Sequence, residues 1–339
     1  MRKRSRFELS LLIALVVVLA LVTAVVLRKK APPECARLLP ESDGIVYVAL
    51  KPVRLATHFD RTPVHRDPDY QQFINATGFV FERDLDEVAF AIHRLPDPHG
   101  PNGPVAYSEV FSGRFDGPRL TKYLAGVSTS HETYLGHDIY DIPVEGRTLR
   151  VAILGYDLVA ASNMPTPEQI HSILDRYHTA ALPFSGPSLL AQQYSDVPLL
   201  SVAWGIGRIG LPFSDKPDGT GNLQLMGLTL PFAADAPVLA SLRFVGSLRL
   251  RVEETTASEA AAANSAESLK TLLSIFQTLQ QNMHPDAVNA SDEEFRQIVN
   301  SVKIDQKNST VVLRATIPLD VLKKTLASSP QQASLPAAP

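Results

Sequence analysis

The sequence predicts an α+β protein: mainly antiparallel sheets covered by helices, in two packed units, behind one N-terminal transmembrane helix. Three observations carry this prediction. Short segments rich in β-branched and aromatic residues follow one another at spacings typical of antiparallel strands. Several of them lead through a proline-containing turn into a short helix with leucine or isoleucine three to five residues apart. An uncharged apolar run fills residues 9–27.

The apolar run has the length of a membrane span. Its 19 residues give roughly 28 Å of helix at about 1.5 Å per residue, close to the thickness of a bilayer's hydrocarbon layer. A cleaved signal peptide is the rival interpretation, because Val22-Thr23-Ala24 offers small residues for a peptidase. The run continues to Leu27, however, and the next small-residue site contains Pro32 and Pro33. We therefore expect an uncleaved anchor.

Basic residues flank both ends of this run, so its orientation depends on which flank must cross the membrane. They are Arg2, Lys3, Arg4 and Arg6 before the run, and Arg28, Lys29 and Lys30 after it. A long C-terminal domain translocates largely regardless of its charge, whereas an outside N-terminus would carry four cations across. We expect residues 1–8 in the cytoplasm, residues 9–27 in the inner (plasma) membrane, and the body outside the cytoplasm.

Composition narrows the class of partner. The chain has 45% hydrophobic and 20% charged residues, and 32 Lys and Arg against 35 Asp and Glu, so no cationic surplus favours nucleic acid.

Its one cysteine, Cys35, excludes an intramolecular disulfide. Because residues 28–43 read as a basic, proline-containing juxtamembrane linker, Cys35 is predicted to be either an incidental thiol or the site of a disulfide between two copies.

The first unit is predicted over residues 44–186. Strands are expected at 44–50, 87–94, 105–114, 132–135, 138–143, 148–154 and 158–161. Helices are expected at 69–77, ending at Gly78; at 119–125, with Asp116 as N-cap and Gly126 as stop; and at 165–178. Residues 95–104 are rich in proline and glycine and predict a loop.

A proline- and glycine-rich stretch at 183–187 predicts the seam before a second unit, residues 187–327. Its expected elements are helices at 189–194, 257–283, 292–300 and 319–326, and strands at 199–204, 222–230, 238–252, 302–305 and 310–317. The long helix carries an apolar stripe, which predicts that Leu272 and Phe276 are buried. Residues 328–339 have too few apolar groups to pack and are predicted to be a disordered tail.

Gly205, Gly207 and Gly210 match the glycine spacing of dinucleotide-binding loops. That chemistry needs a helix to open at the glycines and hold the pyrophosphate on its N-terminal amides. Pro212 lacks one of those amides and biases Leu211 toward an extended conformation. The triplet therefore predicts a strand or strand exit and no cofactor site.

No other motif predicts a catalytic or metal site. The nine histidines include His131 beside Glu132, His137 beside Asp138, and the pair His171 and His178. The last two are seven residues apart, about 10 Å along a helix, too far to share one ion. No Gly-x-Ser-x-Gly or Ser-x-x-Lys pattern occurs. We assign no catalytic, cofactor-binding or metal-binding residue.

The chain resembles a loose class of uncharacterised, single-pass, membrane-anchored bacterial envelope proteins. The resemblance lies in the anchor, Leu38-Leu39-Pro40 before the first strand, Gly113-Arg114-Phe115-Asp116 after a later one, and the alanine-rich long helix. It implies an architecture and a location, and no catalytic residue. We expect a non-enzymatic, extracytoplasmic binding or scaffolding domain for an envelope protein or apolar ligand; the alternative is a membrane-tethered hydrolase with a dispersed site.

Overall fold

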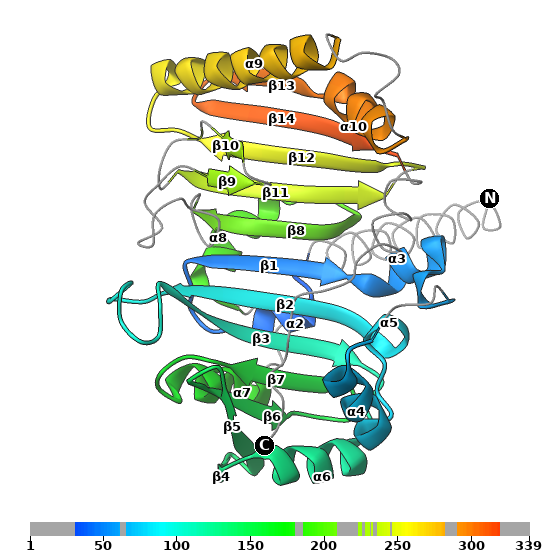
Figure 1. The fold of residues 1–339 in the computed structure, drawn as a ribbon. Coiled ribbons are helices and arrows are strands. Elements are labelled where there is room, and N and C mark those ends of the chain that lie inside the picture. Colours follow the sequence, from blue (N-terminus) through cyan, green and yellow to red (C-terminus); the bar gives the residue numbers. More distant parts are fainter. Residues whose placement is uncertain are drawn as a thin grey trace, which may run out of the picture.

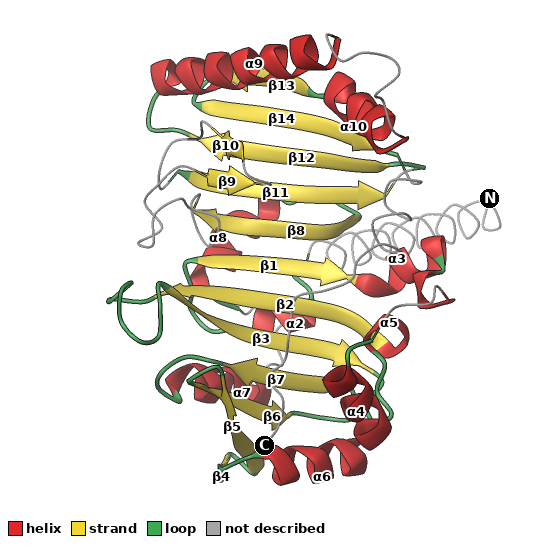
Figure 2. Ribbon diagram, viewed as in Figure 1, coloured by secondary structure: helices red, strands yellow, loops and turns green. Residues whose placement is uncertain are grey.

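The structure is a computed structural model that describes residues 31–61, 66–179, 186–208, 223–225, 228–230, 232, 236–244, 246–281 and 290–318. One antiparallel sheet of 12 strands dominates it (Figures 1 and 2). The strand order is β13-β14-β12-β11-β8-β1-β2-β3-β7-β6-β5-β4, and β9 and β10 form a separate hairpin. The α+β class with mainly antiparallel strands is confirmed.

The strands of the large sheet agree closely with the sequence pattern. They are β1 Gly44–Ala49, β2 Leu85–Arg94, β3 Val105–Gly113, β4 Ser130–Tyr134, β5 His137–Val144, β6 Arg147–Ile153, β7 Leu158–Ser162, β8 Ser201–Arg208, β11 Pro237–Phe244, β12 Leu248–Thr255, β13 Lys303–Lys307 and β14 Thr310–Ile317. The small hairpin pairs β9 Leu223–Leu225 with β10 Leu228–Leu230. Two expectations are wrong. Residues 222–230 contain the hairpin β9–β10 rather than one strand. Residues 238–252 form the hairpin β11–β12 rather than one strand, because Gly246 adopts a positive φ of 70° in the turn between them.

Most of the described helices lie where the sequence places them, with small shifts at their ends, but two short helices, at 34–38 and 81–84, fall where none was expected. They are α2 Glu34–Leu38, α3 Leu50–Thr57, α4 Pro68–Thr77, α5 Phe81–Asp84, α6 Gly117–Val127, α7 Glu168–Thr179, α8 Ser188–Gln193, α9 Glu259–Gln281 and α10 Ala290–Ser301. Asp116 caps α6 as expected, accepting a hydrogen bond from the Arg119 amide at 3.2 Å. Gly126 does not end α6, because the helix continues to Val127 and the Ser128 amide closes it.

The large sheet runs through both predicted units. Strand β8, from the second unit, pairs with β1 from the first over the register Gly44↔Gly207 to Val48↔Ala203. The sheet therefore has no break between β1 and β8. The predicted seam lies partly outside the described residues, and the division into two units stays a prediction.

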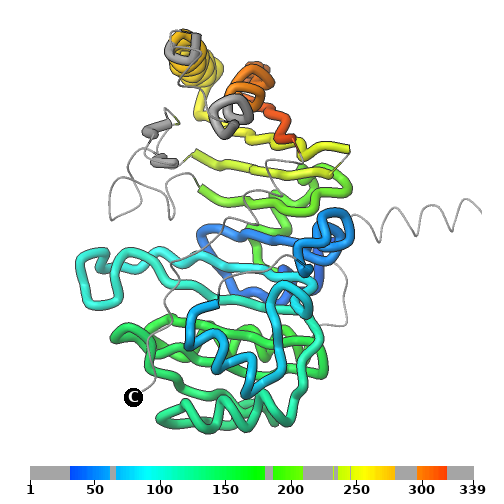
Figure 3. The backbone as a smooth tube through the Cα atoms, turned by 45° about the vertical axis from the view of Figure 1, so that its right-hand side comes forward, coloured from blue at the N-terminus to red at the C-terminus, as the bar shows by residue number. Residues whose placement is uncertain are grey.

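The sheet has two faces, which we name by the helices that cover them. The α2 face carries Tyr47 and Trp204, whose rings stack at 5.5 Å, and is covered by α2, α7 and α8. The α9 face is covered by α9 over β13 and β14 and by α6 over β5 and β6. Figure 3 shows α9 and α6 at opposite ends of the stack of strands.

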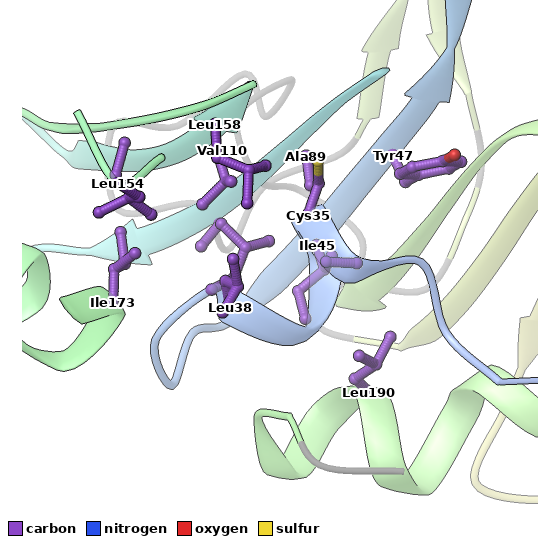
Figure 4. Close-up of a cluster of buried hydrophobic side chains, with 14 of the residues drawn as sticks. Cys35, Leu38, Ile45, Tyr47, Ala89, Val110, Leu154, Leu158, Ile173 and Leu190 are labelled. Atoms are coloured by element: carbon purple, nitrogen blue, oxygen red, sulfur yellow. The ribbon is translucent and has the colours of Figure 1, made fainter. Parts of the chain in front are cut away.

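Helix α2 corrects the expectation that residues 28–43 form a linker. Cys35, Leu38 and Leu39 are each at most 1% exposed and belong to the core on the α2 face. Figure 4 shows Cys35 beside Ala89 and Leu38 beside Val110 and Leu158. Burial also raises the pKa of the Cys35 thiol. The thiol is not in a linker, and a disulfide between two copies would first require this core to open.

Helix α9 corrects the expectation for the apolar stripe. Leu269 is buried with Ala262 and Ala266 against Val311 of β14. Leu272 and Phe276, which were expected to be core residues, are only half-buried, and Ile275 is 51% exposed. Among the described side chains, the buried part of the stripe therefore lies in the first half of α9.

The two outermost strands, β13 and β4, are short and polar. Strand β13 reads Lys-Ile-Asp-Gln-Lys and β4 reads Ser-His-Glu-Thr-Tyr, and most of their residues are exposed. Short, charged strands of this kind discourage pairing with a further strand.

Among the described residues, no helix is both long and apolar enough to cross a membrane. The apolar run at 9–27, the helix expected at 319–326 and the tail at 328–339 lie outside the described residues.

Candidate functional site

The candidate site is the middle of the α9 face, on the four central strands β8, β1, β2 and β3. Residues directly opposite one another in an antiparallel pair share a face, so the register defines its members. We call it the central strip; it consists of Ala203, Gly205 and Gly207 of β8, Gly44, Val46 and Val48 of β1, Val88, Phe90 and Ile92 of β2, and Tyr107, Glu109 and Phe111 of β3.

The covering helices leave this strip open. Helix α9 packs on β13 and β14, and α6 packs on β5 and β6, both to the sides of the four central strands. In Figure 1, which faces the strip, no described helix lies in front of these strands. Val46, Phe90 and Glu109 are accordingly only half-buried, although they lie in the middle of a 12-stranded sheet. Val88 and Ile92 of the same strip are buried.

The strip is apolar apart from the Tyr107 hydroxyl and one carboxyl group. Glu109 faces Phe90 on one neighbouring strand and Ala161 on the other. Burial in these apolar surroundings raises the pKa of Glu109 to about 7. A carboxyl group with a raised pKa on an open apolar surface is a recurrent mark of functional sites. The strip can thus present a neutral hydrogen-bond donor below that pH and an anion above it.

Glu109 should make stability depend on pH. The pKa of this carboxyl rises on folding from 4.5 to about 7, so the free energy of unfolding contains a contribution that is complete below pH 4.5 and is lost as the pH rises to about 7. We expect Glu109→Gln to be more stable than the parent at pH 8 by about 1–3 kcal/mol and equal to it near pH 4.5. Urea denaturation of both proteins at the two pH values measures this, with Glu267→Gln on the exposed side of α9 as the control. An equal difference at both pH values would show that Glu109 titrates normally.

The glycine motif lies in the same strip. Gly205 and Gly207 lie inside β8, which pairs with β1 and β11, so the expectation of a strand is confirmed for both. Gly210 lies outside the described residues. The two glycines differ in their surroundings. Gly207 has a φ of +148°, and a Cβ there would lie 2.8 Å from the carbonyl oxygen of Asp43, whereas a Cβ on Gly205 would first meet Val46 at 3.6 Å.

This difference predicts opposite responses to the same substitution. Gly207→Ala should destabilise the fold by about 2 kcal/mol or more, because alanine rarely adopts this backbone conformation and the Asp43 backbone would have to move. Gly205→Ala should change stability by less than about 1 kcal/mol. Thermal denaturation of the two variants compares them directly. Equal losses would mean that neither glycine is required by its backbone.

A buried chain of hydrogen bonds on the α2 face joins a histidine to two serines. His93 Nε2 lies 2.9 Å from Ser108 Oγ, which lies 3.0 Å from Ser162 Oγ. The pairing resembles a base and a nucleophile, but Ser108 is fully buried and burial lowers the pKa of His93 to about 4. A base this weak, with no solvent path to the serine, suits a structural role.

A second histidine pair lies at the β4 edge. His171 Nε2 of α7 is 2.7 Å from Glu132 Oε1, its ring stacks on Tyr134 at 4.0 Å, and the Tyr134 hydroxyl donates to Asp175 at 3.0 Å. No local pattern in the sequence indicates this pairing, because the partners are 39 residues apart. Within the described ranges, no serine, threonine or cysteine bonds to His171, and no group of three metal-binding side chains converges.

The other histidines and aromatic residues considered in the sequence have separate environments. His137 Nδ1 lies 3.0 Å from the Ile153 carbonyl oxygen, and the His131 ring lies near that of Tyr140. Trp204 and Phe79 are buried, whereas Phe81 is exposed. The structure does not bring the histidines and the glycine motif of the sequence analysis together in one site. The central strip was not identified from the sequence.

Comparison with known proteins gives only a distant structural similarity. No protein-family model matches the chain, and no curated protein matches its sequence. Solved structures of TP0453 are similar over 88% of this chain. Crystal forms IV, III and I have TM-scores of 0.43, 0.45 and 0.43, identities of 12%, 12% and 11%, and 99%, 100% and 98% of their own chains covered.

Proposed function

We propose that this protein is a single-pass, membrane-anchored, extracytoplasmic binding domain that takes an apolar ligand, or an apolar segment of an envelope protein, on its central strip. The observation that carries the proposal is the apolar middle of the α9 face, which the described helices leave uncovered and which contains Glu109. Binding surfaces combine apolar area with a few polar groups that fix orientation. Two grounds support the proposed location. One is the apolar run at 9–27 with its basic flanks, and the other is the resemblance to anchored envelope proteins.

The hydrolase alternative has less support. Of the two histidine pairs, His93 with Ser108 is sealed in the core, and His171 with Glu132 lies on the surface without a hydroxyl bonded to it in the described part of the chain. Neither offers a base, a nucleophile and an accessible site together.

Site-specific photo-cross-linking in intact cells tests the ligand. A photoreactive phenylalanine analogue at Phe90 should form an adduct in the full-length chain. Gly205→Leu should abolish it, because the added side chain would occupy the strip above Val46; Gly205→Ala is the matched control. No adduct at Phe90, or an adduct that Gly205→Leu leaves unchanged, would contradict the proposal.

Protease added to spheroplasts tests the topology. The body should be degraded while the membrane is intact. Protection until the membrane is broken would reverse the orientation, and release of the body into the soluble fraction would exclude the anchor.

A further inference from the structure

The exposed large hydrophobic side chains gather at one end of the sheet. Among the described residues they are Leu55, Phe81, Leu135, Tyr156, Leu199, Leu200 and Ile275. By strand direction, all except Ile275 lie at the end of the sheet where β1 finishes, which we call the β1 end; at β1 and β8 this end is on the right in Figure 1.

The strand register establishes this placement. Leu55 is on α3, directly after β1, and Leu199 and Leu200 directly precede β8, whose start is opposite the end of β1. Phe81 precedes β2, which runs antiparallel to β1. Following the pairs outward, the β6–β7 turn with Tyr156 and the β4–β5 turn with Leu135 fall at the same end.

The opposite end of the sheet is different in composition. It carries the β2–β3 loop, residues 95–104, and the turns at Glu145-Gly146 and Asn308-Ser309. None of the exposed large hydrophobic residues of the described chain lies there. The exposed large hydrophobic side chains are therefore concentrated at the β1 end and are not a general feature of the turns.

Basic side chains lie near the exposed hydrophobic side chains of the β1 end. Lys51 of α3 is 63% exposed. Arg249 of β12 is exposed and lies opposite Arg243 of β11, which in turn lies beside Ser201, the residue after Leu200. Apolar tips beside cations are the combination that lipid surfaces bind, because the tips enter the acyl boundary and the cations stay at the phosphates.

A hydrogen bond also holds the residues just after the apolar run close to the start of β8. The Tyr194 hydroxyl donates to the Ala31 carbonyl oxygen at 3.3 Å, and Tyr194 packs on Trp204 of β8. Leu27, the last residue of the run, precedes Ala31 by four residues, which span at most about 14 Å. An anchor in a membrane would hold Tyr194, and the start of β8 beyond it, close to the lipid.

We propose that the β1 end rests on the lipid surface, with Leu55, Leu199 and Leu200 in the acyl boundary and Lys51 and Arg249 at the headgroups. This proposal rests on the anchor of the proposed function. It adds that the anchored body lies on the bilayer in one fixed orientation, with the β2–β3 loop pointing away from it.

Spin labelling of the full-length chain in vesicles containing anionic lipid tests the docking. A nitroxide is attached at Leu200→Cys, at Leu55→Cys, or at the control His99→Cys, which is exposed in the β2–β3 loop at the opposite end of the sheet. The unlabelled parent checks that buried Cys35 does not react. We expect labels at 200 and 55 to collide mainly with oxygen, which is concentrated in lipid, and the label at 99 to collide mainly with a water-soluble nickel chelate.

The other outcomes are distinct. Chelate-accessible labels at 200 and 55 on a chain that floats with the vesicles would overturn the docking and leave the anchor intact. A chain that does not float would overturn the anchor and the docking with it. Dipolar broadening between labels at 200 would show that this end pairs two copies, which also overturns the lipid proposal.

Discussion

Replacing Arg54 by alanine is expected to lower the free energy of unfolding by about 3–5 kcal/mol. The Arg54 side chain is only 11% exposed. Its Nη1 donates to the Leu85 carbonyl oxygen at 2.7 Å, and its Nη2 pairs with Asp86. Truncation would leave a carbonyl and a carboxylate without this partner at the junction of α3 and β2. Urea denaturation measures the loss.

Lys51→Ala is the matched control for Arg54. Lys51 approaches the same carboxylate, with Nζ 3.5 Å from Asp86 Oδ2, but its side chain is mostly exposed. An exposed pair of this kind contributes less than about 1 kcal/mol. Equal effects of the two substitutions would mean that burial of the guanidinium contributes nothing beyond charge pairing.

Leu38→Ala should lower the free energy of unfolding by about 2–5 kcal/mol. Leu38 is 1% exposed and packs with α7 and the α2 face of the sheet, so its removal leaves a cavity between three elements. Leu55→Ala makes the same chemical change at a side chain that is 69% exposed, and we expect a change within about 0.5 kcal/mol. Thermal denaturation of both variants compares them; a small loss for Leu38→Ala would show that α2 can detach without unfolding the sheet.

The strands were predictable because their patterns are local. In β1 the residues Ile45 and Tyr47 alternate with Val46 and Val48, and the turn after it contains Pro52, so a strand and a following helix can be read without knowing any partner. Asp116 was predictable for the same reason, since an N-cap acts within one turn of its helix.

The burial of α2 and the environment of Glu109 could not be predicted, because both depend on residues that are distant in the sequence. Helix α2 is five residues long and lies among prolines, which suggested a linker; its burial depends on β2, β3 and α7. Glu109 stands among Tyr107, Val110 and Phe111, a hint that a carboxyl group sits in an apolar strand. Its raised pKa, however, requires the register that puts Phe90 and Ala161 on either side.

The polar edge strands β13 and β4 acquire a further meaning if the body is confined to a membrane. Confinement to two dimensions raises the local concentration of copies and aligns their sheets, which are the conditions under which open sheets polymerise edge to edge. At any such junction Lys303 and Lys307 on β13, and Glu132 on β4, would lose water, which disfavours pairing of the edges. The charged edges would then keep neighbouring copies apart on a crowded membrane, so that a sheet this wide can stay a separate molecule.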